Sequence, residues 1–478
     1  MRTSKDYLEA LKAMRHNVYL WGEKVDRPYE HPQIRTGVNV ISLTYDMAQD
    51  PRYEGLLTAK SHLSGEKINR FTHIHQSPQD LMAKVQMTRV YCQQTGGCIQ
   101  RCMGIDALNS LSIVTYDMDK QLGTSYYERL LRTVRRVQDD DLTLNAAMTD
   151  VKGDRSLKPH EQEDPDMYLR VVERKADGIV VRGAKAHNTL APYAEELVVL
   201  PTRALGKEDA DYAVAFVIPA DAPGITLICR ASSPAATKRM ESPVTSRYGF
   251  SDSLTVFDDV FVPWERVLMC GEWHYAGILA GTFANYHRHS YCGCKPGIAD
   301  ILLGSAALAA DYNGVGRASH IRSKLVDMIT TAEMVYACGI TASVNGQPMP
   351  SGTYLPDTIY SNAGKYFSGT NLHHEYEIVH DIAGGLIATL PSEADYFNPG
   401  TGDLMRKYLK GRAGVTTDDR LRCFRLIEDL TVSRHGAMVL VAGVHGGGSP
   451  EAEKVAIWQN YDLEGKKALA KKLARIEE

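Results

Sequence analysis

The sequence predicts an α+β protein with three consecutive parts: a helical N-terminal domain, a middle β domain and a C-terminal helical domain. Three observations support this order. Apolar residues recur at helical spacing towards both ends of the chain. Short β-rich segments separated by turn residues fill the region from about residue 145 to 270. We find no internal repeat, so the parts differ from one another. The predicted domains are residues 1–143, 144–275 and 276–478.

The first domain is predicted to be helical from its start. Ser4 is a candidate N-cap ahead of an amphipathic segment. Residues 80–104 also carry helix-forming residues, interrupted at Gly96-Gly97, and residues 126–141 place apolar side chains at helical spacing among many charges.

The middle domain is predicted from five β-rich segments. They are residues 178–183, 196–200, 212–218, 224–229 and 253–263. Beyond Trp264 the pattern becomes helical again. The predicted helical segments there are residues 299–313, 321–342, 421–441 and the Lys/Glu/Ala-rich tail 465–478.

Bulk composition excludes several classes of protein. The 478 residues are 44% hydrophobic and 23% charged, and the formal net charge is -4, which argues against nucleic-acid binding. We expect a cytoplasmic protein without membrane contact, because neither a signal peptide nor a long apolar run is apparent. Nine cysteines in a reducing compartment do not predict a disulfide framework, so they are core residues, reactive thiols or metal ligands.

Two short segments place metal-ligand residue types close together. Cys98 and Cys102 are four residues apart, and His287 and Cys294 are seven apart, so each pair would share a face of a helix. Three thiols and one imidazole form a complete set of four ligands. Buried cysteines are also common without any metal. The spacing leaves structural zinc and an iron–sulfur cluster equally open.

Two common functional motifs do not occur in the sequence. No G-x-G-x-x-G follows a predicted strand, so the sequence does not predict a Rossmann dinucleotide site. No G-x-S-x-G elbow occurs, so a hydrolase triad has no support.

At the cysteine segments the sequence resembles a known family, the 4-hydroxyphenylacetate 3-hydroxylase flavoproteins, and within it the hydroxyacyl-CoA dehydratases. The resemblance covers nearly the whole chain. It is carried by the segments 98–104, 148–155, 182–187, 286–295, 381–385, 391–395 and 445–446.

The resemblance implies a fold of the acyl-CoA dehydrogenase type, FAD, a [4Fe-4S] cluster and a homotetramer with flavin sites at subunit contacts. It assigns the cluster to Cys98, Cys102, His287 and Cys294, and it makes Cys292 a bystander. The residues that it implies for flavin binding are Met148, Thr149, Asp150, Arg155, Lys185, His187, Thr189, Asp381, Gly384 and Gly385.

The implied reaction is dehydration of 4-hydroxybutyryl-CoA to crotonyl-CoA, with isomerisation of vinylacetyl-CoA as an additional candidate activity. The thioester acidifies only the α position, whereas the hydroxyl leaves from the γ carbon and the β hydrogen is not acidic. Acid–base catalysis alone is therefore insufficient, and a radical route, in which one electron is removed and later returned, is expected.

Five residues are expected to act on the substrate. They are His287, Tyr291, Lys295, Asp252 and Gln100. His287 is expected to be both cluster ligand and base for the α proton. Asp252 and Ala442 each stand where the family has a glutamate, and an alanine cannot transfer a proton. Three alternatives follow: a different hydroxyacyl-CoA substrate, a flavin-dependent aromatic monooxygenase, or a zinc-stabilised scaffold.

Overall fold

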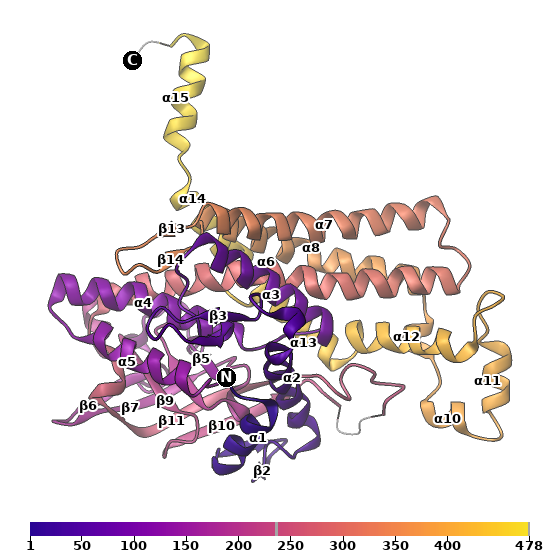
Figure 1. Ribbon diagram of the computed structural model, residues 1–478, viewed down its shortest axis with the longest axis horizontal. Coiled ribbons are helices and arrows are strands. Elements are labelled where there is room, and N and C mark those ends of the chain that lie inside the picture. Colours follow the sequence, from indigo (N-terminus) through magenta and orange to yellow (C-terminus); the bar gives the residue numbers. More distant parts are fainter. Residues whose placement is uncertain (235–237, 477–478) are drawn as a thin grey trace.

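The computed structural model describes residues 1–234 and 238–476. Helices, sheets and then a second group of helices follow one another along the chain (Figure 1). The predicted α+β fold class is confirmed, and this is the order expected of the acyl-CoA dehydrogenase type of fold.

The N-terminal part supplies five helices and four short strands. The helices are α1 (Ser4–Ala13), α2 (Pro32–Gln49), α3 (Pro78–Thr95), α4 (Cys102–Leu122) and α5 (Tyr126–Asp139). The strands are β1 (Val18–Leu20), β2 (Glu23–Val25), β3 (Thr58–Lys60) and β4 (Lys67–Asn69). These strands were not predicted, because segments of three residues are too short to display an alternating pattern.

Two sheets form the middle part. The larger has the strand order β2-β1-β10-β11-β7-β6 and the smaller the order β12-β9-β8-β5. Their remaining strands are β5 (Leu144–Ala147), β6 (Arg170–Arg174), β7 (Gly178–Lys185), β8 (Glu196–Val199), β9 (Val214–Pro219), β10 (Ile225–Ala231), β11 (Ser251–Pro263) and β12 (Val267–Cys270). Because β1 pairs in parallel with β10, the N-terminal segment completes the larger sheet. The three-domain division of the sequence stays a prediction.

The C-terminal part is built around three long helices that lie side by side (Figure 1). They are α6 (Trp273–Tyr312), α7 (Ser319–Val344) and α8 (Thr358–Ala383). The hairpin strands β13 (Gln347–Pro348) and β14 (Tyr354–Leu355) precede α8, and the shorter helices α9 (Leu386–Thr389), α10 (Glu393–Phe397), α11 (Gly402–Tyr408), α12 (Thr417–Thr431), α13 (Arg434–His445) and α14 (Pro450–Asn460) follow it. The last helix, α15 (Leu463–Ala474), points away from the body of the molecule (Figure 1).

Two of these helices are long and apolar enough to cross a bilayer by length and composition alone. The apolar window of α6 is 67% buried inside the protein, and that of α7 is 28% buried. Helix α6 is the central helix of the group, in contact with α3, α4, α7 and α8.

Candidate functional site

The two thiols of the Cys98–Cys102 motif do not share a helix, which corrects the expectation of one helical face. Helix α3 ends at Gly96, whose φ of 64° is left-handed, and α4 begins at Cys102. Cys98 therefore lies in the connecting loop. Gln100 in the same loop has a φ of 67°, so the loop reverses sharply between the two cysteines. The Gly96-Gly97 interruption in the sequence was the signal of this break.

Helix α6 carries the second pair of predicted ligands and packs tightly on α3. A Cβ added at Gly293 would lie 2.1 Å from the carbonyl oxygen of Val85, and one at Gly297 would lie 2.5 Å from that of Arg89. Only glycine permits this approach at both positions. The close packing brings the α6 segment with Cys294 against α3, while His287, seven residues earlier, lies on the same face of α6.

A buried carboxylate holds the His287 ring. Nδ1 of His287 lies 2.9 Å from Oδ2 of Asp106, and one ligand atom each of Cys102, Asp106 and His287 lie within 4.8 Å of one another. Lys84 donates to Asp106 Oδ1 at 3.0 Å, and the Ser290 hydroxyl donates to the same carboxylate at 3.0 Å. With Nδ1 engaged, Nε2 of His287 is the nitrogen that remains for a ligand or substrate.

Burial keeps two of the three predicted ligand thiols protonated. It raises the pKa of Cys98 to about 12 and, with the charge of Cys98, raises the pKa of Cys102 well above its ordinary value. Cys294 differs: a hydrogen bond from Cys92, opposed by burial and aided by Lys295, lowers its pKa. A bound cation would favour the thiolate form of all three sulfurs.

Tyr291 lies close to two ammonium groups. Nζ of Lys295 is 4.9 Å and Nζ of Lys365 is 5.0 Å from the centre of its ring. The phenol donates to the backbone oxygen of Ala442 at 3.0 Å. Burial, and after it the charges of nearby thiols beginning with Cys294, raise the pKa of Tyr291 well above its ordinary value, so the phenol is a proton donor at neutral pH.

Gln100 joins the thiol loop to the β domain. Its Nε2 donates to the backbone oxygen of Gly249 at 3.0 Å, and its Oε1 accepts a hydrogen bond from the Tyr193 hydroxyl. The side chain is fully buried. Both the nitrogen and the oxygen of the Gln100 amide therefore form hydrogen bonds with the β domain. These two hydrogen bonds stabilise the loop that contains Cys98.

The predicted flavin residue Thr189 and the predicted catalytic Asp252 form a partly buried pair. The Thr189 hydroxyl donates to Oδ1 of Asp252 at 2.5 Å. Burial raises the pKa of Asp252, opposed by Thr189 and by the charge of His187. The negative charge of Asp252 in turn acts on Cys98, so this pair and the thiols belong to one region.

Lys185 is held by the chain itself. Its ammonium donates to the backbone oxygens of Met148 at 2.9 Å and Leu200 at 2.8 Å, and lies 2.7 Å from Oδ1 of Asp150. These contacts use its three donors. The backbone amide of Ala186 also donates to the backbone oxygen of Thr149 at 2.7 Å. Hydrogen bonds therefore join the predicted flavin segments 148–150 and 185–187, the second of which precedes Thr189 in the chain.

The other predicted flavin residues lie on the surface. Arg155 is exposed in a turn. Asp381, Gly384 and Gly385 are exposed at the end of α8, where Asp381 pairs with Lys324 of α7. None of the described contacts joins these four to the thiols within one chain.

Cys292 faces away from the predicted ligands. Its thiol lies 3.4 Å from the backbone oxygen of Arg288 and 3.8 Å from that of Ser361 on α8. The bystander interpretation of Cys292 remains a prediction that agrees with this position.

Several buried polar residues of this region were not identified from the sequence. They are Lys84, Cys92, Asp106, Lys365 and Glu375. Asp106 follows Cys102 by one helical turn, which was a usable signal. The others depend on contacts between helices that are distant in the sequence.

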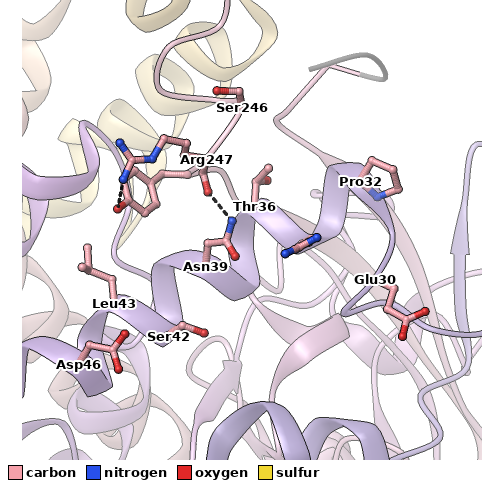
Figure 2. A pocket seen from close by; sticks show the side chains of 11 residues that line it. Glu30, Pro32, Thr36, Asn39, Ser42, Leu43, Asp46, Ser246 and Arg247 are labelled. Atoms are coloured by element: carbon pink, nitrogen blue, oxygen red, sulfur yellow. Dashed lines mark hydrogen bonds between the residues drawn. The ribbon is translucent and has the colours of Figure 1, made fainter. Parts of the chain in front are cut away.

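A polar hollow of about 480 Å³ lies between α2 and residues 246–248 (Figure 2). Arg35 and Arg247 are among the residues that line it, and Asn39 donates to the backbone oxygen of Arg247 at 2.9 Å. Gly249, whose carbonyl holds Gln100, follows this wall directly. The wall of the hollow and the residue that holds Gln100 are therefore adjacent in the chain.

Comparisons with known proteins identify the family. Residues 3–269 match the 4-hydroxyphenylacetate 3-hydroxylase N-terminal family and residues 276–475 match its C-terminal counterpart. The chain is 41% identical, over all of both chains, to "4-hydroxybutyryl-CoA dehydratase/vinylacetyl-CoA-Delta-isomerase" of Clostridium aminobutyricum.

Solved structures agree. A 4-hydroxybutyryl-CoA dehydratase from N. maritimus, described as oxygen tolerant, superimposes with a TM-score of 0.96 at 42% identity, over 100% of this chain and 95% of that one. The FAD complex of the oxygenase component of a 4-hydroxyphenylacetate 3-monooxygenase superimposes with a TM-score of 0.90 at 29% identity, over 99% and 98%. The chain therefore belongs to the 4-hydroxyphenylacetate 3-hydroxylase flavoprotein family and is similar over its whole length to 4-hydroxybutyryl-CoA dehydratases.

Proposed function

We propose that this protein is a flavin- and iron–sulfur-dependent dehydratase that converts 4-hydroxybutyryl-CoA to crotonyl-CoA by a radical route and also isomerises vinylacetyl-CoA. The carrying observation is the buried group of Cys102, Asp106 and His287, whose ligand atoms lie within 4.8 Å of one another. The charges of Cys98 and Cys294 act on Cys102 from nearby. Similarity over the whole length to relatives named for this activity supports it.

The residues present fit an iron–sulfur cluster. Cys98 and Cys102 have raised pKa values that a bound cation would offset, and the pKa of Cys294 is already lowered. The ring of His287 offers Nε2, because Asp106 engages its other nitrogen. When bound, the cluster would supply a Lewis-acidic iron and the flavin a one-electron carrier. Zinc would suit the same donors, so metal content decides between them.

His287 and Tyr291 are suited to the proton steps. We assign both tasks of His287 to Nε2: it would bind the cluster, and it could receive the α proton, which the thioester acidifies, only after its bond to the metal is broken. Asp106 and Lys84 would keep the ring oriented. The buried Tyr291 phenol stays protonated and can donate to the departing hydroxyl. Lys295 and Lys365 flank its ring and favour developing negative charge.

Thr189, His187 and Asp252 are the residues that we assign to the flavin side of the site, with Gln100 between them and the thiols. The exposed Asp381, Gly384 and Gly385 would then contact the flavin of a neighbouring subunit.

A homotetramer accounts for that surface arrangement. Helix α7 exposes apolar side chains, as does α15. They are Val326, Ile329, Met334 and Val344 on α7, and Leu469 and Leu473 on α15. Burial between subunits would stabilise these faces without a membrane. We place the protein in the cytoplasm.

The polar hollow beside Gly249 offers Arg35 and Arg247 to the phosphates of the CoA ester.

The alanine at position 442 leaves the identity of the acyl chain open. It contributes a backbone oxygen to Tyr291 but no acid. A hydroxyacyl-CoA with a different chain is therefore the second candidate. An aromatic monooxygenase is less favoured, because that reaction does not need this thiol and imidazole set.

The test is the composition of the protein purified without oxygen. The proposal predicts a brown protein with bound flavin and about four irons per chain. Flavin without iron would favour the monooxygenase, and one zinc per chain without colour would favour a scaffold.

A further inference from the structure

Lys365 and Glu453 form a buried ion pair between α8 and α14. Nζ of Lys365 lies 3.3 Å from Oε1 of Glu453, and both side chains are fully buried. Helix α14 packs on α8. Within Pro450–Asn460, all of which the structure describes, Glu453 is the only buried residue. The side chain that α14 buries is therefore a charged one, whereas a surface helix ordinarily buries apolar side chains.

Stability alone does not account for this pair. Removing two charges from water is costly, and apolar residues of similar size in the same place are often at least as stable. Oε2 of Glu453 is also buried without a hydrogen-bond partner among the described residues, which adds to the cost. A buried ion pair with an unsatisfied oxygen indicates that one of its charges has a task.

The ammonium of Lys365 lies over the ring of Tyr291. Its Nζ is 5.0 Å from the centre of that ring, and it donates to the backbone oxygen of Val444 at 3.1 Å. With Oε1 of Glu453, these contacts account for its three N–H groups. The backbone oxygen of Ala442, two residues before Val444, accepts from the Tyr291 hydroxyl. The end of α13 and the first turn of α14 thus hold the phenol and the neighbouring ammonium together.

We propose that Glu453 is a positioning residue of the active site, which holds the Lys365 ammonium, in its charged form, against Tyr291. This inference rests on the proposed function, in which the Tyr291 phenol donates to the departing hydroxyl. The C–O bond at the γ carbon breaks, and its oxygen takes the phenol proton and leaves as water. Negative charge then develops on the phenol oxygen, and a fixed ammonium nearby stabilises it. Glu453 itself exchanges no proton in this step.

Lys365 needs an anion to stay charged at this depth. Burial lowers the pKa of Lys365, and the charge and hydrogen bond of Glu453 oppose that effect, whereas the positive charges of Lys295 and Arg288 on α6 add to it. Without the carboxylate, the buried amine would lose its proton or turn away from Tyr291. The phenol would then lose the charge that assists its proton transfer.

The experiment measures kcat and KM for 4-hydroxybutyryl-CoA with holoenzyme whose flavin and iron content is verified. Glu453→Gln removes the negative charge at nearly constant size, and Glu453→Asp keeps the charge on a side chain one methylene shorter. Lys365→Met removes the ammonium, and a double variant combines Glu453→Gln with Lys365→Met. Glu196→Gln is the matched control, because Glu196 on β8 is also a buried carboxylate with cationic partners, Arg136 and Arg266.

We expect Glu453→Gln to keep its iron, its flavin and its KM, and to lose kcat about tenfold to hundredfold. Glu453→Asp should recover part of that loss, because the charge is restored. The double variant should match Lys365→Met in kcat, because Glu453 acts through Lys365 and the two losses then do not add. Glu196→Gln should match wild type in kcat.

Thermal unfolding of the same proteins separates this role from a structural one. The double variant should be more stable than Lys365→Met, which leaves a buried carboxylate unpaired, yet its kcat should be no higher. An unchanged kcat in Glu453→Gln, or losses that add in the double variant, would overturn the inference and leave the proposed function standing. So would loss of iron or flavin from Glu453→Gln, because the pair would then be structural. A wild-type holoenzyme that dehydrates no hydroxyacyl-CoA would overturn the proposed function and this inference together.

Discussion

Nδ1 of His287 and Oδ2 of Asp106 are 2.9 Å apart in a pocket that also buries Lys84. This pair engages Nδ1 of His287 and leaves Nε2 as the ring nitrogen without a described hydrogen bond. It ties the helix that begins at Cys102 to the helix that carries Cys294. The orientation of the proposed metal ligand therefore depends on a buried carboxylate and a buried ammonium.

Replacing Asp106 by asparagine should weaken the centre. The change removes the charge that holds His287 and leaves Lys84 buried without an ionic partner. We expect a 10–100-fold loss of activity or metal affinity, of order 1–3 kcal/mol. Turnover and iron content are the readouts. Asp117→Asn, an exposed position on the same helix, is the control and should match wild type. Equal activity of both variants would mean that Asp106 does not orient His287.

His287→Cys should separate ligation from catalysis. A fourth thiolate can still hold a cluster, but it removes the imidazole that we assign to the α proton. We expect iron to be retained and dehydration to be lost, measured as iron per chain and as turnover of the CoA ester. Normal dehydration by this variant would contradict the dual role of His287.

Ala442→Glu should raise the rate with 4-hydroxybutyryl-CoA if an acid at this position assists the reaction. The backbone oxygen that accepts from Tyr291 is unaffected by the change. Ala442→Gln has nearly the same size without an ionisable group, so a rate gain confined to glutamate identifies the acid as the cause. An unchanged rate in both variants would exclude position 442 as limiting.

The stability of the folded protein should depend on pH because of the buried Glu375 carboxyl. It is 5% exposed, and burial, opposed by Lys295, raises its pKa from 4.5 to about 7. The folded state therefore holds this proton more tightly than the unfolded state. The stability that the neutral acid preserves is fully present below about pH 4.5 and is lost as the pH rises through about 7, with an upper magnitude of ~3 kcal/mol.

As the pH rises from about 5 to about 8.5, wild type should lose this stability and Glu375→Gln should not. The variant should therefore be more stable relative to wild type at the higher pH than at the lower. Thermal unfolding of both proteins at the two pH values measures the difference. Glu377→Gln, an exposed neighbour on α8, should give no such trend. A constant difference across the pH range would show that the Glu375 carboxyl does not titrate abnormally.

Much of the fold follows from local patterns in the sequence. The helix of residues 126–141 and the strands at 178–183 and 196–200 were predictable, because their apolar residues repeat at the helical or strand period. The loop between Cys98 and Cys102 was not, since its left-handed Gln100 is stabilised by Tyr193 and Gly249 from the β domain.

The same limit applies to the site. His287 and Cys294 could be paired from their spacing on one helix. Asp106 acquires its role only when α3, α4 and α6 pack together. Gly293 and Gly297, which permit the packing of α6 on α3, have the four-residue spacing of close helix contacts, but that spacing does not identify the residues that the packing brings together.

The most direct test is anaerobic incubation of the iron- and flavin-loaded protein with a panel of hydroxyacyl-CoA thioesters, read by mass spectrometry. We predict that 4-hydroxybutyryl-CoA loses the mass of one water molecule and yields crotonyl-CoA. Unchanged mass for every thioester in the panel, from protein whose flavin and iron content is verified, would contradict the proposed dehydratase.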